Sequence, residues 1–336
     1  MLDCRLRGIT SHLPPSFGGL VEWPVAPSMT YFWPNGKPWM NTTNRAIASY
    51  LGLAIGDALG STVEFMTPRE IAVQYGIHDT LRGGGWLHLK PGTVTDDTTM
   101  SLALGNAILE KKQVDALSAA YAFDKWMRAK PVDIGNTVRR NLLQFRKSGN
   151  PEAPYSDHDA GNGAAMRVLP VALATLGQHD DDVRAACRAQ AHVTHHCALS
   201  DAACECLVFM LQSALRGVDK NQLLQIYALP LAARHPEYKF HEVRQISNPS
   251  GYVVDTLIAV FQSFFETNNF RDCLIDVVNR GGDADTTGAI AGMLAGALYN
   301  LECIPDTWLN GLESETKLLC TYQAKSLINI NADLSE

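Results

Sequence analysis

Apolar side chains recur every three or four residues along most of the chain, which is the spacing of one face of an α-helix. The first such run follows Asn44, which we expect to be its N-cap. Further helices are predicted at about 97–111, 115–129, 135–147, 161–176, 180–194, 198–216, 251–267, 270–279, 285–300 and 314–329. Strand patterns are sparse and the connections are short. The pattern therefore predicts a single all-α domain over residues 44–336.

Residues 1–43 differ from this pattern because no apolar period is sustained there. Six prolines and several aromatic residues, among them Trp23, Trp33 and Trp39, are spread through the segment. Disordered tails are usually poor in aromatic residues. We predict an extended N-terminal arm that docks either on a partner or on its own domain.

Composition narrows the class of protein. With 336 residues, 46% of them hydrophobic, the chain can build a large core. Its net charge of -7 argues against a nucleic-acid partner, which would need a basic surface. The eight cysteines lack paired zinc spacing and fit buried thiols better than disulfides. No signal peptide or run of ~18 apolar residues is present, so we expect a cytoplasmic protein without a membrane partner.

Two acidic clusters each precede a predicted helix: Thr95-Asp96-Asp97-Thr98 and the segment 281–288, which contains Asp283, Asp285 and Thr286. Taken singly, each Asp or Thr could be an N-cap. Together, four carboxylates at two helix starts repel one another unless cations compensate them. Oxygen ligands without nearby Cys or paired His suit Mg²⁺ or Mn²⁺. Glu64 adds a carboxylate after a glycine-rich run, whose small residues would let the backbone approach a ligand closely.

Two other motifs share letters with the second cluster. Asp283 to Gly288 matches the start of an EF-hand loop, but Leu294 stands where the bidentate glutamate should be. The cluster also matches the nucleophile motif of haloacid-dehalogenase phosphatases, although residues 278–282 do not form the apolar strand that should precede it. We exclude the first alternative and keep the second as a minor one.

Several segments, in this order, resemble the ADP-ribosylglycohydrolase family, including its dinitrogenase-reductase-activating branch. They are residues 52–60 with Glu64, 95–98, 161–167, 194–195 and 281–288, and the likeness covers about residues 44–330. The resemblance implies a compact orthogonal helical bundle with a central cleft that holds two metal ions.

The resemblance also implies the ligands of two Mg²⁺ or Mn²⁺ ions. Thr95, Asp96 and Asp97 would bind one ion. Glu64, Asp283 and Thr286 would bind the other, and Asp285 would bridge both. Asp96, supported by Asp97, would activate the attacking water.

The substrate site follows from the same resemblance. A loop would cradle ADP-ribose with backbone amides, and its residues are Gly161, Asn162, Gly163, Ala164 and Met166. His195 would line the ribose side, and Asp133 would face the substrate guanidinium. On the sequence alone, the loop could instead be a helix start, His195 a structural residue and Asp133 an N-cap. Trp86 receives no functional assignment.

The implied activity is hydrolysis of the bond between ADP-ribose and an arginine of a protein substrate. Family members that act as immunity proteins against ADP-ribosyltransferase toxins can carry an N-terminal extension that blocks the toxin. We therefore expect that residues 1–43 bind such a toxin. The alternatives are regulatory removal of ADP-ribose from a housekeeping target, as in the dinitrogenase-reductase branch, and inhibition of the toxin without catalysis.

Overall fold

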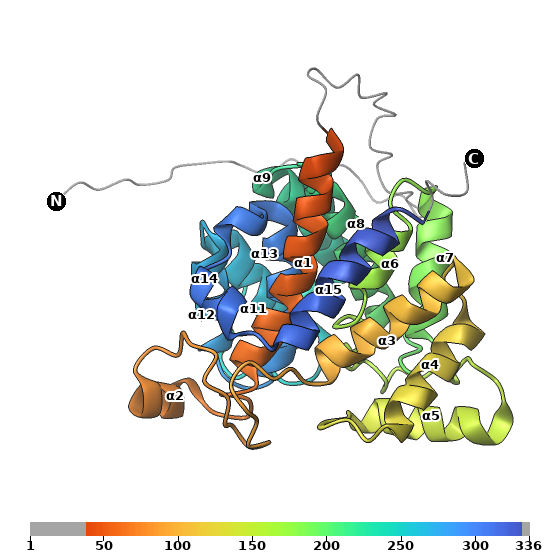
Figure 1. The fold of residues 1–336 in the computed structure, drawn as a ribbon, viewed down its shortest axis with the longest axis horizontal. Coiled ribbons are helices and arrows are strands. Elements are labelled where there is room, and N and C mark those ends of the chain that lie inside the picture. The colour runs from red at the N-terminus through yellow and green to blue at the C-terminus, as the bar shows by residue number, and fades with distance from the viewer. Residues whose placement is uncertain (1–37, 331–336) are drawn as a thin grey trace. The chain divides into compact units, whose positions relative to one another are not determined.

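The structure, a computed structural model, describes residues 38–330, with side chains from residue 41 (Figure 1). Between these bounds it contains helices and no β-strand, apart from the isolated bridges Gly84–Leu89 and Gly161–Tyr252. The helices are α1 (Pro38–Gly60), α2 (Pro68–Tyr75), α3 (Asp96–Lys111), α4 (Ala116–Arg128), α5 (Asn136–Ser148), η1 (Asn162–Ala164), α6 (Leu169–Ala174), α7 (Asp180–Ala191), α8 (Ala198–Leu215), α9 (Lys220–Leu223), η2 (Leu224–Ala228), α10 (Leu229–Arg234), η3 (Pro236–Tyr238), α11 (Val253–Glu266), α12 (Phe270–Val278), α13 (Ala284–Tyr299), η4 (Leu301–Cys303), α14 (Asp306–Gly311) and α15 (Ser314–Ile328). The predicted all-α class is confirmed.

The start of the first helix was predicted too late. Helix α1 begins at Pro38, so Asn44 lies inside it and is not its N-cap. Proline suits a helix start because its fixed φ fits the helix and its missing N–H would be unpaired there anyway. The early turns are also held by distant contacts: Arg45 donates to the carbonyl oxygens of Ala297 and Leu298 at 2.7 and 2.5 Å. The rest of the predicted arm, residues 1–37, lies outside the described residues.

The single helix predicted over 161–176 is also wrong. This segment forms the short η1, a turn and then α6, with Pro170 in the first turn of α6. Pro170 fits the first turn of α6, where its missing N–H costs no helical hydrogen bond, but it would break a helix that continued from η1. Helices α2 and α14 escaped the sequence prediction because they are short, with 8 and 6 residues. The segment 220–234 was overlooked although its apolar residues Leu223, Tyr227 and Leu231 recur at helical spacing. The other predicted helices agree with the structure to within two residues at each end, except that α7 ends at Ala191, three residues before the predicted end.

Helix α1 packs along α13 and also contacts α15 (Figure 1). The contact with α13 needs small residues: a Cβ atom at Gly56 would lie 1.9 Å from the carbonyl oxygen of Gly288, and one at Gly52 would lie 2.2 Å from that of Gly292. The glycines of α1 therefore allow two helices to approach each other. The expectation that the small residues of this run let the backbone approach a ligand was wrong for Gly56. This close packing fixes the end of α1 beside the start of α13.

Helix α8 satisfies the length and hydropathy of a membrane span, but 72% of its apolar window is buried inside the protein. It contacts α6, α7, α11 and α13. We therefore assign it to the hydrophobic core. The seven cysteines from Cys187 onward are free thiols, and all except Cys303 are buried, as predicted.

Candidate metal centre and substrate loop

Three carboxylates lie close together where the end of α1 packs beside the start of α13. Glu64 lies in the turn after α1, and Asp283 and Asp285 lie at the start of α13. One oxygen atom from each lies within 4.8 Å of the others. The turn before α13 contributes to this placement, because Gly282 has a positive φ of 64° and accepts a 2.7 Å hydrogen bond from the Phe65 amide.

The cluster at residues 95–98 contacts these three carboxylates through the Thr95 hydroxyl. The Thr95 Oγ1 atom lies 3.2 Å from Asp97 Oδ2 and 3.3 Å from Asp285 Oδ2. The Thr286 hydroxyl lies 3.5 Å from the same oxygen of Asp97. Thr95 and Asp283 precede α3 and α13, yet neither side chain makes a capping hydrogen bond. The structure does not support the N-cap alternative for these two residues.

Asp57, which the sequence analysis did not select, organises the start of α3. It is fully buried in α1 and accepts hydrogen bonds from the amides of Thr95 and Thr98 at 2.9 and 3.1 Å. Both threonine hydroxyls donate to it as well, at 2.9 and 2.5 Å. Asp57 thus caps α3 from another helix and fixes the orientation of Thr95. A lone carboxylate within an apolar helical run was the available signal.

Burial makes this group electrostatically unfavourable without a cation. Burial, followed by the charge of Asp133, raises the pKa of Asp96 to about 8. Burial is also the first cause that raises the pKa of Glu64 to about 8, and that of Asp57, despite its four hydrogen bonds, to about 6. The pKa values of Asp97 and Asp285 lie well above their usual range for the same reason.

One oxygen of this group is also unpaired. Asp97 Oδ1 is buried and has no hydrogen-bond partner within the described part of the chain. Buried polar atoms are normally paired, so an orphaned carboxylate oxygen indicates a missing ligand. Carboxylate and hydroxyl oxygens fit the preference of Mg²⁺ and Mn²⁺. The residues present therefore fit hard divalent cations.

Trp86 is a second residue that the sequence analysis missed. Its indole Nε1 donates a 2.6 Å hydrogen bond to Glu64 Oε2, and its ring lies 5.5 Å from that of Phe65. Both aromatic side chains are exposed, at 48% and 64%. Trp86 therefore orients one carboxylate of the group from the solvent side. The three glycines before it were the only sequence signal.

The predicted substrate loop adjoins the carboxylates. The side-chain Nδ2 of Asn162 donates to Asp283 Oδ2 at 2.6 Å and to Thr256 Oγ1 at 2.9 Å. The backbone of the loop is held as well, because the backbone N–H of Asn162 donates to the Gly251 carbonyl oxygen at 3.0 Å. Ala164 and Met166 are buried. A change at Asn162 would therefore affect the loop and the carboxylates together.

His195 lies against the glycines of this loop. A Cβ atom at Gly163 would lie 2.7 Å from the His195 ring, and one at Gly161 would lie 3.0 Å from its Nε2 atom. The glycines thus make room for the imidazole. Burial, followed by Arg167, lowers the pKa of His195 to about 3, so the ring is neutral.

A buried relay favours one tautomer of His195. Arg167, which is fully buried, donates from its guanidinium to Thr194 Oγ1 at 2.7 Å. The same hydroxyl lies 2.8 Å from His195 Nδ1. With one lone pair taken by Arg167, the hydroxyl can donate its proton to Nδ1, which leaves the ring proton on Nε2, beside the loop. Arg167 and Thr194 therefore position His195.

Asp133 is half-buried in the connection between α4 and α5. Its charge is one of the causes that raise the pKa values of Glu64 and Asp96, after burial. Helix α5 begins after Gly135, and within residues 38–330 the hydrogen bond that Asp133 accepts comes from the adjacent Ile134 amide. The N-cap alternative for Asp133 is not observed.

Comparison with known proteins agrees with this geometry. The sequence model of the ADP-ribosylglycohydrolase family matches residues 38–333, nearly the whole chain. The chain belongs to the ADP-ribosylglycohydrolase family. The family expected from the sequence is thus confirmed, together with the class of enzyme, a hydrolase.

Two kinds of relative of this ADP-ribosylglycohydrolase bear on its substrate. The ADP-ribosyl-[dinitrogen reductase] glycohydrolase of Rhodospirillum rubrum is 48% identical over 85% of this chain and 96% of its own. The ADP-ribosylarginine hydrolase Tri1 of Serratia proteamaculans is 32% identical over 84% of this chain and 82% of its own. In the solved structure of an ADP-ribosylglycohydrolase-related protein complex, one chain is 33% identical, with a TM-score of 0.77 over 87% of this chain and 99% of that one.

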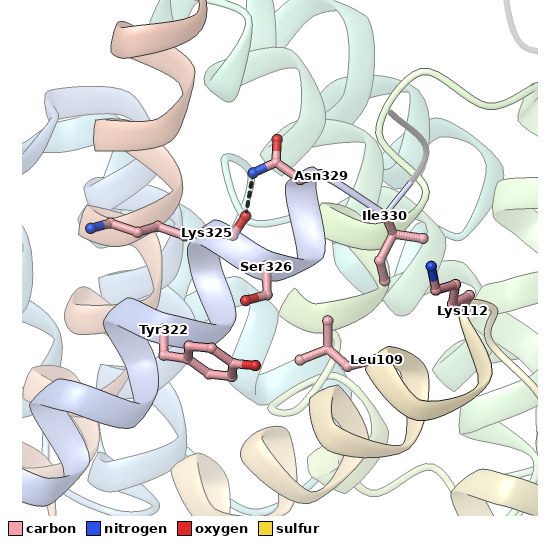
Figure 2. Close-up of a pocket in the computed structure, with 7 residues that line it drawn as sticks. All are labelled: Leu109, Lys112, Tyr322, Lys325, Ser326, Asn329 and Ile330. Carbon is pink, nitrogen blue, oxygen red and sulfur yellow. Dashed lines mark hydrogen bonds between the residues drawn. The ribbon is translucent and has the colours of Figure 1, made fainter. Parts of the chain in front are cut away.

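A separate pocket of about 410 Å³ lies between the end of α3 and α15 (Figure 2). Its lining contains Leu109, Lys112, Tyr322, Lys325, Ser326, Asn329 and Ile330. None of these residues belongs to the carboxylate group or to the 161–166 loop. This pocket is not the candidate site.

Proposed function

We propose that this ADP-ribosylglycohydrolase hydrolyses the N-glycosidic bond between ADP-ribose and an arginine side chain of a protein. The proposal rests mainly on the hydrogen bond between Asn162 and Asp283, which joins a loop suited to a nucleotide to a group suited to metal ions. The ADP-ribosylarginine hydrolase relatives from two organisms support the choice of arginine.

The metal ligands that we propose are those expected from the sequence. Thr95, Asp96 and Asp97 would hold one Mg²⁺ or Mn²⁺ ion. Glu64, Asp283 and Thr286 would hold a second, with Asp285 shared, and the contact of Asp285 with both Thr95 and the Glu64 group supports that sharing. When bound, such ions neutralise the carboxylates, orient the ribose hydroxyls and make a water molecule more acidic.

The side chains then have distinct tasks. Asp133 pairs with the substrate guanidinium by charge-assisted hydrogen bonds. Asp96 accepts a proton from the water that attacks the anomeric carbon, and Asp97 supports it. The carbon–oxygen bond forms as the carbon–nitrogen bond breaks. The proton ends on the departing guanidine, and the products are ADP-ribose and unmodified arginine.

The direct test is release of ADP-ribose from an arginine-modified protein, followed by mass spectrometry with Mg²⁺, Mn²⁺ or EDTA. Serine-modified protein serves as the second substrate. We expect metal-dependent release from arginine and at least a tenfold loss in Asp133→Asn. The exposed Asp182→Asn variant is the matched control. Equal release from both linkages, or full activity of Asp133→Asn, would contradict the assignment to arginine.

We further propose that the biological setting is immunity against an ADP-ribosyltransferase toxin, which residues 1–37 would block while the helical domain reverses the modification. The proline- and tryptophan-rich composition of that segment supports this, since tryptophan is common at binding hot spots. The Rhodospirillum rubrum relative supports the alternative, regulatory removal of ADP-ribose from an enzyme of the host cell.

Deleting residues 1–36 separates these settings because the deletion stops before α1. For an immunity protein we expect unchanged hydrolysis and loss of binding to the catalytic domain of a transferase toxin from the same genome. Binding that persists after the deletion would show that residues 1–36 do not block the toxin. No binding by the full chain would favour the regulatory alternative. A full chain that binds the toxin but does not hydrolyse the modified substrate would establish an inhibitor without catalysis.

A further inference from the structure

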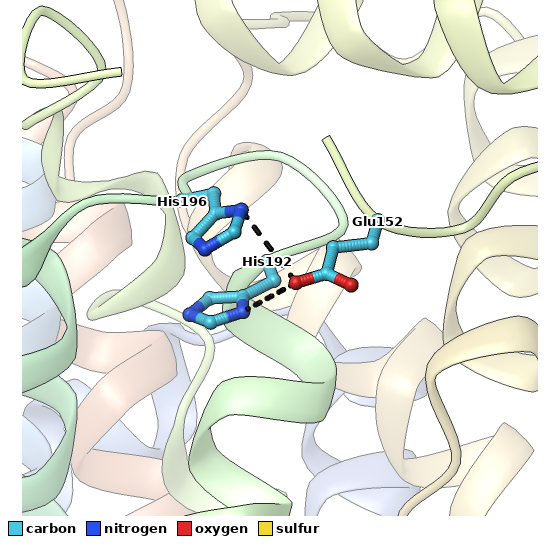
Figure 3. A group of neighbouring side chains, drawn as sticks. All are labelled: Glu152, His192 and His196. Carbon is cyan, nitrogen blue, oxygen red and sulfur yellow. Dashed lines mark hydrogen bonds and ion pairs between the residues drawn. The ribbon is translucent and has the colours of Figure 1, made fainter. Parts of the chain in front are cut away.

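A second group of potential metal ligands lies outside the carboxylate centre. It consists of Glu152, which follows α5, and of His192 and His196, which bound the turn between α7 and α8 (Figure 3). We call it the histidine group. The two imidazole rings are stacked, with centroids 3.8 Å apart and planes 21° apart. Both Nδ1 atoms point toward the same oxygen of Glu152 (Figure 3).

The distances suit a tetrahedral metal ion. Glu152 Oε1 lies 3.3 Å from His192 Nδ1 and 3.6 Å from His196 Nδ1. Zinc binds histidine nitrogen and carboxylate oxygen at ~2.0–2.2 Å, so two ligand atoms of a tetrahedral site lie roughly 3.3–3.5 Å apart. These two spacings are thus already close to what zinc requires, and the three ligand atoms all lie within 4.8 Å of one another. Two imidazoles also favour zinc over magnesium.

The surroundings of His192 resemble those of a metal-bound histidine. Its Nε2 atom lies 2.9 and 3.0 Å from the two oxygens of Asp201, in the first turn of α8. A carboxylate that accepts the second ring N–H fixes the ring and makes the other nitrogen a better ligand. Asp201 therefore leaves Nδ1 of His192 available to an ion.

The group is also accessible. The side chains of His192 and His196 are 15% and 21% exposed, and that of Glu152 is 54% exposed. An ion could enter from solvent, and water could complete its coordination. His196 Nδ1 also lies 2.7 Å from the Ala153 carbonyl oxygen. Binding therefore moves the His196 ring proton to Nε2 and gives up that hydrogen bond, which lowers the affinity.

We propose that Glu152, His192 and His196 bind one Zn²⁺ ion, at a site separate from the Mg²⁺ or Mn²⁺ centre. The ion joins two segments that already touch, because the Ala153 amide donates to the His192 carbonyl at 2.8 Å and the Ser156 amide to the His196 carbonyl at 3.0 Å. One of these segments leads into Gly161 and the other contains His195. Zinc would therefore hold the segment that leads into the proposed substrate loop against the segment that carries His195.

Zinc binding is measured on the full, metal-free chain by competition with a chromophoric chelator, in excess Mg²⁺. We expect one zinc equivalent that is bound at least tenfold more weakly by Glu152→Gln, His192→Ala and His196→Ala. Asp201→Asn should weaken binding by roughly 10–100-fold. His241→Ala is the matched control, since His241 is an exposed histidine that also lies near a glutamate. Thermal unfolding of each metal-free variant checks its folding.

A second measurement assigns the ion to its site. Asp285→Asn disrupts the carboxylate centre and should leave this zinc equivalent in place. Cobalt at the histidine group should give the intense visible absorption of a tetrahedral site, and Glu152→Gln should remove it. No zinc binding, binding lost in Asp285→Asn, or binding unchanged in folded Glu152→Gln would each overturn the proposal. These readouts do not depend on hydrolysis, so the proposed function can fail independently.

Discussion

The carboxylate centre and the histidine group differ in how the fold builds them. The centre joins residues from α1, α3 and α13 in a buried site, and Thr95 and Asp285 alone are 190 positions apart. The histidine group joins one turn to a neighbouring loop near the surface. The centre therefore depends on the packing of the whole domain, whereas the histidine group depends mainly on local backbone contacts.

The two groups also differ in how their charges are balanced. In the centre, buried carboxylates face one another, and one oxygen of Asp97 has no partner among the described residues. In the histidine group, His192 lies between Glu152 and Asp201, so a protonated His192 can offset one of the two carboxylate charges. A bound cation would consequently stabilise the centre more than the histidine group.

The largest effect is expected from separating α1 and α13. Gly56→Ala places a methyl group against the Gly288 backbone, which no side-chain rotation relieves. We expect a loss of at least about 3 kcal/mol in the free energy of unfolding, although alanine favours helix. Gly135→Ala is the control, because its Cβ atom would meet only ordinary contact at 3.9 Å. Urea denaturation measures both, and equal stability would contradict the packing argument.

The next effect concerns pH and metal ions. Burial raises the pKa values of Asp96 and Glu64 to about 8 from unfolded values of roughly 4. Folding is therefore favoured by protonation below about pH 4, and this stability is lost as the pH rises toward 8. We expect the Tm of the metal-free protein to fall from pH 5 to pH 8. A saturating ion should restore about 2–3 kcal/mol, more at pH 8 than at pH 5.

Asp97→Asn tests the same group more sharply because it removes one buried carboxylate and one proposed metal ligand. We expect a flatter dependence of Tm on pH and little stabilisation by Mg²⁺ or Mn²⁺. Differential scanning calorimetry at each pH, with and without metal, measures both quantities. An unchanged pH dependence together with full stabilisation by metal would show that Asp97 lies outside the centre.

A smaller effect is expected from the relay to His195. Thr194→Val keeps the shape of the side chain but leaves Arg167 and His195 Nδ1 without the hydroxyl. An unpaired buried polar group costs about 1–3 kcal/mol in the free energy of unfolding. Because His195 would also lose the contact that orients its ring, we expect ADP-ribose to bind at least fivefold more weakly. Thr194→Ser should restore the affinity, as measured by calorimetry. Failure of serine to do so would point to packing instead of the relay.

The smallest effect is expected at Trp86. Trp86→Phe removes the indole donor to Glu64 and keeps an aromatic ring beside Phe65. Because the pair is partly exposed, we expect Mn²⁺ affinity to fall by roughly fivefold, less than for buried partners. Trp126→Phe is the matched control, since that indole donates to Thr99. Equal affinity in the two variants would show that Trp86 does not orient Glu64.

Much of the fold was predictable from the sequence because long amphipathic helices carry their own period. Helices α3, α4 and α5 each begin and end within one residue of the prediction. The start of α1 was not predictable in this way, because contacts of Arg45 with residues near 297 stabilise its first turns. The break before α6 depends on the loop that pairs with Gly251.

The site likewise contains residues that the sequence predicted and residues whose roles depend on distant contacts. The Thr95 and Asp283 clusters were visible because adjacent acidic residues stand out, and the structure brings both beside Asp285. Asp57 and Trp86 were missed because a single carboxylate or indole carries no pattern, and their roles arise only from partners 38 and 22 positions away. The histidine group was missed because Glu152 lies 40 positions before His192.

The pairing of α1 with α13 also determines the order in which the new chain can fold during synthesis. The Ser49 hydroxyl donates to the Met293 carbonyl across a separation of 244 residues. At about 5–20 residues per second, the ribosome completes α13 roughly 10–50 s after α1 has been made. During that interval the apolar face of α1 lacks its main partner. Helix α1 is therefore the segment that we expect a chaperone to protect during translation.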